Sequence, residues 1–400
     1  MDNSSIFIIP TISEDTVGLY IPSDQGEWEE FYLDPDYFLC YIRDLAKDCM
    51  RLRSFRYRCP DSVDIYMYED KLLSCRRPHL SGIQFVSFGS GIGFLEFVVD
   101  YGQMSPHEIC EFAYRFKKTA PSREHYQIGA KLTLQEAATK ILPGVRLFFD
   151  CEADFKRECL CYHCLNCTTD REQRLHTLLR LRRSYHSDFS VNTAEDETDM
   201  VYMPYEYDWW AGSEEALVNI SCPTSDERTN RYIDQFKSIQ LEKDYHFMYL
   251  LLLNQRYSAI RLIEQVAGGS RDLKHIQEIA QRIVALKTNY AFRIVSGDMI
   301  YQEVYNRMYD ILNIDNLLKD VEDNESRMEM VNIRQEEKTG KVVNTILSGI
   351  AALSIFSAAI DAASLLDRFG LSSTVSTVLA TAVALAAIIF GVYFFRKNGQ

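Results

Sequence analysis

The residues best suited to metal chemistry lie in one short segment of the chain, CLCYHCLNC (residues 159–167). Its four thiols belong to Cys159, Cys161, Cys164 and Cys167. Closely spaced thiolates are good zinc ligands, although a structural zinc site usually takes its second ligand pair from a distant segment. Cys151 or His163 would therefore replace one of the four in a zinc site. An iron–sulfur centre and ordinary buried or free thiols are the alternatives.

A second set of polar residues is embedded in apolar sequence near the C-terminus. Residues 342–360 and 371–395 carry no charge, and a transmembrane helix needs about 20 mostly apolar residues. Steps of three and four residues along the first run give a heptad seam: Asn344, Leu347, Ala351, Ser354, Ala358 and Asp361. Such a seam is typical of a helix that faces copies of itself. We expect it to line a pore in an oligomer, with Asp361 attracting cations at the outer mouth; close packing of small residues is the alternative.

Basic residues beside the two apolar runs predict their orientation. These residues are Lys338, Lys341, Arg396 and Lys397. Because Lys and Arg are enriched on the cytoplasmic side of a membrane, we expect spans at 342–366 and 371–395, an outer turn at 367–370, and both termini in the cytoplasm. A buried helical hairpin is the competing interpretation, although a core helix rarely runs so far without charge.

The region that leads into the first span is predicted to be a helical stalk, residues 231–341. No proline occurs between Arg271 and Gly340, and apolar residues recur at helical spacing. Residues 247–266 read as a buried helix. We expect the last part of the stalk to be one long helix that continues into the membrane, and a soluble coiled-coil arm is the alternative.

Residues 1–230 alternate strand and helix signals, which predicts an α/β domain with a mixed sheet and flanking helices. GSGIG (residues 89–93) lies between two β-rich runs, so we interpret it as a hairpin turn rather than a nucleotide-binding loop. Ser105 and Glu108 form a capping box. The aromatic-rich segment 202–210 is interpreted as a subunit contact or as core. The residues form no recognisable catalytic constellation, so we do not expect an enzyme.

The charge balance opposes one class of partner. The formal net charge of −14 is unfavourable for general nucleic-acid binding, which needs concentrated positive charge. The arginine-rich segment 171–186 is either an anion site or, more simply, a solvated helix. The sequence opens without a signal-peptide pattern, so we expect a cytoplasmic domain with mostly reduced thiols.

This plan resembles the CorA family of cation channels. The segments that carry the resemblance are GIGFLEFVVDYGQMSPHEICEFAYRF, FMYLLLLNQRYSAIRL and YQEVYNRMYDILNIDNLLKDVEDNESRM, followed by the two apolar runs. The resemblance implies a homopentamer in which the first span lines the pore, with Ser348 added to the seam, and the second span packs outside it. It also implies Mg²⁺ or another divalent cation as the permeant or regulatory ion.

The pore mouth departs from that family. CorA magnesium transporters carry Gly-Met-Asn at the outer end of the first span, where this chain reads AAIDAASLLDRFG (residues 358–370). Magnesium selectivity therefore does not carry over. CorA-like proteins without the motif include those of type III CRISPR systems, in which a nucleotide second messenger, such as an adenosylmethionine–AMP conjugate, acts during phage infection.

The resemblance implies a homo-oligomeric ion channel in the inner membrane of a bacterium or archaeon. Ligand binding to the cytoplasmic domain would open it, as in an antiviral effector. A housekeeping Mg²⁺ transporter and a non-conducting, membrane-tethered sensor are the alternatives.

Overall fold

The computed structural model describes residues 3–13, 28–31, 33, 36–40, 42–44, 52–57, 63–67, 78–118, 126–128, 134–142, 145–148, 159–185, 201–267, 273–323 and 354. The chain divides into two compact units. The first comprises residues 1–261 and 292–318, and the second comprises residues 262–291 and 319–400.

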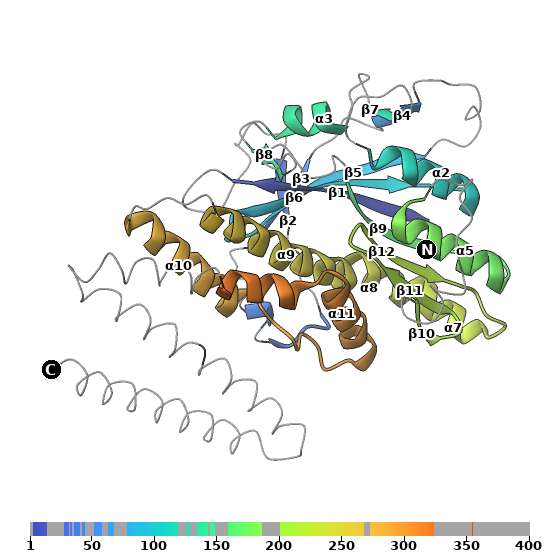
Figure 1. Ribbon diagram of the computed structural model, residues 1–400. Coiled ribbons are helices and arrows are strands. Elements are labelled where there is room, and N and C mark those ends of the chain that lie inside the picture. The colour runs from blue at the N-terminus through green and yellow to red at the C-terminus, as the bar shows by residue number, and fades with distance from the viewer. Residues whose placement is uncertain are drawn as a thin grey trace, which may run out of the picture. The chain divides into compact units, whose positions relative to one another are not determined.

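A twelve-stranded mixed sheet organises the described part of the first unit (Figure 1). Its main path runs β10 (Val201–Tyr205), β11 (Asp208–Gly212), β12 (Ala216–Ser221), β9 (Leu160–Asn166), β1 (Ser4–Ile12), β6 (Ile92–Asp100), β5 (His79–Ser87), β3 (Arg53–Tyr57), β2 (Trp28–Phe31). Strands β4 (Val63–Met67), β7 (Tyr126–Ile128) and β8 (Arg146–Leu147) pair at its margins. Described neighbours on the main path are antiparallel except β12 and β9, which are parallel.

The β5–β6 hairpin shows how the glycines of GSGIG are used. The turn closes through hydrogen bonds from Gly91 N to Phe88 O (3.0 Å) and from Phe88 N to Ile92 O (2.9 Å). Gly91 has φ of 82°, a left-handed value that glycine adopts without a steric cost. A Cβ on Gly93 would lie 2.8 Å from the Phe85 ring and from Thr11 Oγ1. The predicted hairpin turn is therefore confirmed.

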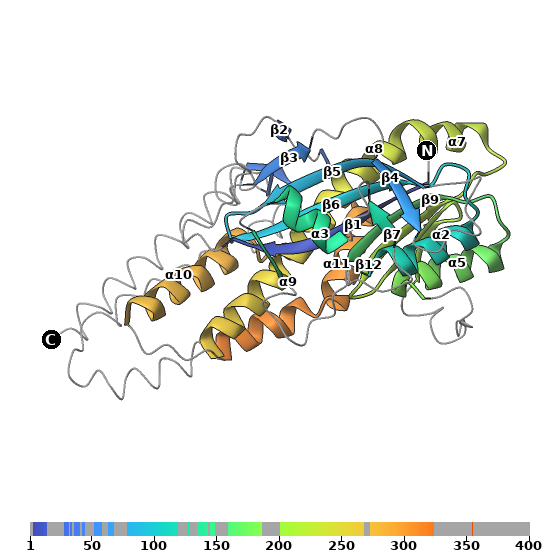
Figure 2. The same ribbon diagram turned by 90° about the horizontal axis from the view of Figure 1, so that it is seen from above.

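One face of the sheet is covered by α2 (Pro106–Phe116), α3 (Leu134–Ile141) and α5 (Arg171–Arg183), as seen from above in Figure 2. Helix α2 begins with the predicted capping box between Ser105 and Glu108, which satisfies backbone N–H groups of its first turn. Its buried side meets the sheet through aromatic contacts, with the Phe7 ring 4.6 Å from that of Phe116. These contacts anchor one apolar core.

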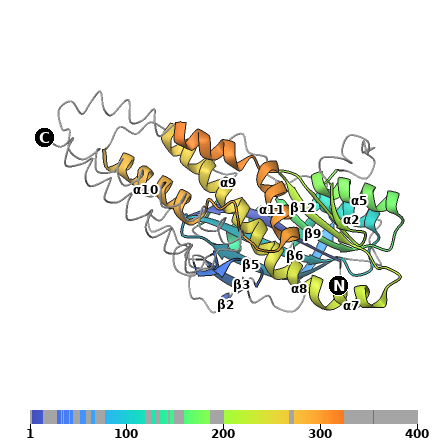
Figure 3. The same ribbon diagram turned by 90° about the horizontal axis from the view of Figure 1, so that it is seen from below.

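The opposite face is covered by a continuous run of helix, residues 227–267, and by α11 (Met299–Ile311), as seen from below in Figure 3. The run comprises α7 (Glu227–Tyr232), the π-helical segment η1 (Ile233–Lys237), α8 (Ser238–Gln240), the π-helical segment η2 (Leu241–Tyr245) and α9 (His246–Ala267). In α9, residues 247–253 are fully buried, and each such apolar side chain contributes about 1.5–3 kcal/mol. The predicted buried helix is confirmed.

The second unit contains α10 (Leu273–Asn289). Ile279, Ile283 and Leu286 are buried at helical spacing along it. Lys287 Nζ lies 2.9 Å from Glu322 Oε1, which joins two sequence-distant parts of this unit.

The predicted helical stalk, residues 231–341, is interrupted in its described part, and the long helix expected in its last part lies mostly outside the described residues. Helix α10 ends at Asn289, residues 290–298 are not helical, and α11 begins at Met299 after an Asp298 N-cap. Asn313, with φ of 55°, interrupts the helix again. Helical spacing alone did not reveal these breaks, because Asp298 and Asn313 act through capping and turn geometry.

The predicted fold class included two transmembrane helices, and this part of the prediction is corrected. The mixed sheet with flanking helices is present, but none of the helices in the described residues is both long and apolar enough to cross a membrane. The predicted spans 342–366 and 371–395 and the turn 367–370 lie outside the described residues, apart from Ser354.

Breaking the buried contact between Glu96 and His246 should destabilise the fold. Glu96 Oε1 on β6 lies 2.7 Å from His246 Nε2 on α9, and both side chains are almost fully buried. Glu96→Gln should lower the free energy of unfolding by about 1–3 kcal/mol, because an amide NH₂ in place of Glu96 Oε2, a buried atom without a hydrogen-bond partner, would be an unsatisfied donor. Denaturant unfolding measures the change. Glu303→Gln, at a half-exposed pair with Arg307, is the control and should cost under about 1 kcal/mol. Equal losses of unfolding free energy in the two variants would contradict a stabilising role for the Glu96–His246 contact.

His163 should make the fold acid-labile. Burial, with a smaller contribution from the Lys117 charge, lowers the pKa of His163 from its ordinary 6.5 to about 3. The unfolded chain therefore takes up a proton below pH 6.5 that the folded chain refuses, so stability falls as pH drops from 6.5 toward 3. The slope should approach about 1.4 kcal/mol per pH unit. Unfolding measured between pH 5 and 7 should show a smaller slope for His163→Gln. His107→Gln, on the exposed surface of α2, is the matched control; equal slopes for the two variants would overturn the prediction.

Candidate ligand pocket

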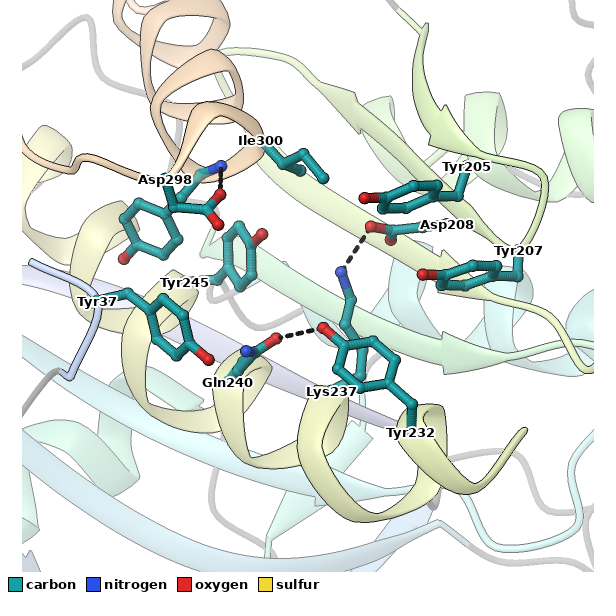
Figure 4. A pocket seen from close by; sticks show the side chains of 11 residues that line it. Tyr37, Tyr205, Tyr207, Asp208, Tyr232, Lys237, Gln240, Tyr245, Asp298 and Ile300 are labelled. Atoms are coloured by element: carbon teal, nitrogen blue, oxygen red, sulfur yellow. Dashed lines mark hydrogen bonds and ion pairs between the residues drawn. The ribbon is translucent and has the colours of Figure 1, made fainter. Parts of the chain in front are cut away.

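A pocket rich in tyrosine opens beside the β10–β11 turn in the first unit (Figure 4). Its cavity volume is about 50 Å³, and the space among its side chains, open solvent at the mouth included, is about 410 Å³. We call it the tyrosine pocket. Its lining residues are Tyr37, Tyr205, Tyr207, Asp208, Tyr232, Lys237, Gln240, Tyr245, Asp298, Ile300 and Tyr301.

The helical wall of this pocket has unusual backbone geometry. Lys237 ends the π-helical segment η1, Tyr245 ends η2, and Gln240 lies in the α8 turn between them. A π-helix is wider than an α-helix and occurs mostly as single turns, often at functional sites. Here the two π-helical turns place Lys237 and Tyr245 on the pocket side of the run.

A buried ion pair forms the floor of the tyrosine pocket. Lys237 Nζ donates to Asp208 Oδ2 over 2.6 Å, and the two side chains are 4% and 2% exposed. Asn219 Nδ2 donates to Asp208 Oδ1 over 2.7 Å, so both carboxylate oxygens are held. The Lys237 ammonium also lies 5.0 Å from the ring centroids of both Trp210 and Tyr245, a favourable cation–π arrangement.

Aromatic rings form the walls and the rim. The Tyr205 and Tyr207 rings stack in parallel, with centroids 5.1 Å apart and an interplanar angle of 4°. Tyr245 and Tyr301 meet at 4.7 Å deeper in the pocket. Tyr205 is 48% exposed and Tyr232 is 37% exposed, so both present ring surface at the mouth. Exposed aromatic faces of this kind stack with planar groups.

Four phenol groups of the pocket, those of Tyr207, Tyr232, Tyr245 and Tyr301, are neutral donors at physiological pH. Burial raises the pKa of Tyr207 to about 12, and burial also raises the pKa values of Tyr232, Tyr245 and Tyr301. Tyr232 Oη donates to Gln240 Oε1 over 3.1 Å, and Tyr301 Oη donates to the Asp244 carbonyl. In Figure 4 the hydroxyl ends of Tyr205, Tyr207 and Tyr232 point into the pocket. A polar, planar ligand would find several hydrogen-bonding groups there.

Tyr37 is held at the pocket by hydrogen bonds to residues that are distant in sequence. Asp244 Oδ1 accepts from the backbone N–H groups of Asp36 (2.7 Å) and Tyr37 (3.1 Å). Ser296 Oγ donates to Tyr37 O over 2.6 Å, just ahead of the Asp298 cap of α11. One wall of the pocket therefore links the Tyr37 segment, η2 and the start of α11.

Three of the exposed large apolar side chains, Tyr37, Tyr205 and Tyr232, line the tyrosine pocket. Within the described residues, the exposed large hydrophobic side chains are Tyr37, Met203, Tyr205, Tyr232, Phe236, Ile239 and Met299. Each lies on a pocket element or beside one in sequence. Scattered exposed apolar side chains are ordinary, whereas a cluster indicates a binding surface.

A wider hollow of about 490 Å³ lies between the end of α5 and the β11–β12 turn. It contains Arg182 and Arg183 from the arginine-rich segment, together with Glu214 and Glu215. Glu214 pairs with Arg256 at 3.0 Å and Glu215 with Lys117 at 2.9 Å. Both signs of charge are present, so this hollow has less of the character of an anion site than the sequence alone indicated.

The structure separates the four cysteines that were candidate zinc ligands. They lie along and beside β9, and all are buried and outside any disulfide. Cys161 and Cys164 are three residues apart on an extended strand, so they face opposite sides of the sheet. Cys161 and Cys167 are about 20 Å apart at about 3.3 Å per strand residue, whereas zinc holds each thiolate at about 2.3 Å. No group of three or more His, Cys, Asp or Glu suited to a metal occurs in the described part of the chain.

Of the seven expected pore-lining residues, only Ser354 is described, where it is helical and exposed. The other six lie outside the described residues: Asn344, Leu347, Ser348, Ala351, Ala358 and Asp361.

Sequence reasoning missed the tyrosine pocket because its residues come from four distant segments. The aromatic segment 202–210 was the available signal, and its side chains divide between core and pocket: Trp209 and Trp210 are buried, and Tyr205 and Tyr207 line the pocket. Lys237, Tyr245 and Asp298 carry no local pattern that connects them.

Removing one partner of the Lys237–Asp208 pair should cost far more stability than removing both charges. Lys237→Met leaves a buried carboxylate unpaired, so the free energy of unfolding should fall by about 3–5 kcal/mol. The double variant Lys237→Met with Asp208→Asn should recover most of that loss. Tryptophan fluorescence reports unfolding in denaturant. If the single and double variants were equally unstable, the two charges would not be coupled.

Comparison of the chain with protein-family models, with curated proteins and with solved structures gives no match.

Proposed function

We propose that this chain is a membrane effector in which a nucleotide messenger binds the tyrosine pocket and thereby controls ion flow. The observation that carries the proposal is the pocket itself, which combines stacked exposed rings, neutral phenol donors and a buried ion pair. Aromatic side chains that stack on a base, together with hydrogen bonds to its edges, are the usual means of holding an unpaired nucleobase. The effector acts as a homo-oligomer and not as an enzyme.

The pocket is well placed to transmit binding. Asp298, Ile300 and Tyr301 belong to the start of α11, whereas Lys237 and Tyr245 belong to the helical run. A ligand that touches both would favour one arrangement of the two helices over others, which is the requirement for a ligand to shift a conformational equilibrium.

The membrane role rests on sequence. The uncharged runs 342–360 and 371–395 follow α11 in the chain, and runs of this length and apolarity favour a lipid environment over water. The messenger class rests on the resemblance to the CorA group associated with type III CRISPR systems.

The test is ion flux from liposomes that contain the full-length chain, with and without an adenosylmethionine–AMP conjugate. Flux that requires the conjugate is the expected result. Magnesium flux without any messenger would replace the proposal with a transporter, and messenger binding without flux would replace it with a non-conducting sensor.

Two pocket variants should weaken the response. Tyr205→Ala and Tyr232→Ala each remove a ring at the mouth, and base–aromatic stacking contributes about 1–3 kcal/mol. The messenger concentration for half-maximal flux should therefore rise by about 5- to 150-fold for either variant. Tyr114→Ala on α2, which does not line the pocket, is the matched control. An unchanged response in both pocket variants would exclude the tyrosine pocket as the messenger site.

A further inference from the structure

The charges that line the tyrosine pocket bear on which part of a ligand can enter it. Among its described lining residues, Lys237 is the cation and Asp208 and Asp298 are the anions, which leaves one net negative charge. The Lys237 ammonium is committed to Asp208 in a pair that solvent hardly reaches. A phosphate group would need positive charge or a cluster of N–H donors at its contact point, and the described lining offers no uncompensated cation.

The start of α11 does not supply an anion site either. A helix N-terminus attracts anions through its free backbone N–H groups and its dipole. Here Asp298 Oδ1 already accepts from Tyr301 N over 2.9 Å, so the N-cap carboxylate occupies this position. A phosphate brought to the same place would meet a carboxylate.

The remaining surface of the pocket favours uncharged or cationic planar groups. The rings of Tyr205 and Tyr232 are partly exposed at the mouth, and aromatic faces attract both planar groups and cations. The phenol hydroxyls and the Gln240 amide, whose Oε1 accepts from Tyr232, can pair with the polar edges of a base.

We infer that the tyrosine pocket receives the nucleoside part of its ligand, an uncharged or cationic planar group, and that phosphate groups remain outside it. This inference rests on the proposed function for the identity of the ligand. It adds the orientation of that ligand: the base lies inward, toward the Lys237–Asp208 floor, and the phosphate lies toward solvent.

The test compares adenosine, AMP and pyrophosphate as ligands of the full-length chain by calorimetry. Adenosine should bind three- to tenfold more tightly than AMP. Pyrophosphate should not compete with adenosine for the pocket. Binding of adenosine should also change little between 50 and 500 mM salt, because screening acts only on charged contacts.

A charge variant makes the test specific to the pocket. Asp298→Asn retains a good N-cap residue and removes the carboxylate, so the preference for adenosine over AMP should shrink toward onefold. Asp310→Asn, the same change on an exposed residue of α11 that pairs with Arg293, should leave the preference as it is.

The outcomes separate the two proposals. Tighter binding of AMP than of adenosine, or competition by pyrophosphate, would overturn the orientation while leaving a messenger-gated effector intact. Adenosine preference that Asp298→Asn does not alter would place the nucleoside in another site and overturn the inference. Adenosine preference that follows the pocket variants, but without messenger-dependent flux, would support the orientation and reject the effector.

Discussion

The architecture depends on two buried polar contacts that lie nine positions apart on one helical run. Lys237 pairs with Asp208 on β11, and His246 contacts Glu96 on β6. A buried polar group or charge that lacks its partner is destabilising, so the folded state favours the register in which both contacts are made. Together they set both the position and the rotation of the run against the sheet. Apolar packing alone would let the helical run shift along the sheet far more easily than a hydrogen-bonded pair does.

That constraint explains the form of the tyrosine pocket. The register that satisfies Glu96 and Asp208 also buries Tyr245 against Trp210, with ring centroids 4.4 Å apart. The π-helical segment η2 lies between these two contacts, and η1 ends at the first of them, Lys237. The pocket is thus a by-product of anchoring the run at two points, and its chemistry follows from the rings that this anchoring brings together.

Local patterns in the sequence predicted local structure well. The hairpin at 89–93, the Ser105–Glu108 capping box and the buried helix at 247–266 each depend on neighbours in the chain, and each is present. The cysteine cluster was ambiguous because the same spacing brings thiols together in a turn but separates them along a strand. Residues 160–166 form a strand between β1 and β12, so the thiols are separated.

Long-range features could not be predicted in the same way. The tyrosine pocket joins residues near 37, 205, 237 and 298, and no spacing rule connects positions so far apart. The stalk region was expected to be helical from the absence of proline and from helical spacing, and these signals did not reveal that the chain leaves the helix between Asn289 and Met299. There Gln302 Oε1 accepts from the backbone N–H groups of Val295 and Ser296, at 2.9 and 3.1 Å. A side chain several residues ahead stabilises that break, and periodicity does not detect such a contact.

The π-helical geometry of η1 and η2 also bears on how this chain could vary in length. A π-helical turn holds about one residue more than an α-helical turn between the same flanking positions. Loss of one residue within either segment would convert it to ordinary α-helix and leave the flanking anchors in register. The same loss inside α9 would rotate everything beyond it by about 100° and misplace its buried face. The wall of the pocket is therefore the part of this long helix where the loss of one residue can be absorbed, and where a new ligand preference could arise without refolding the core.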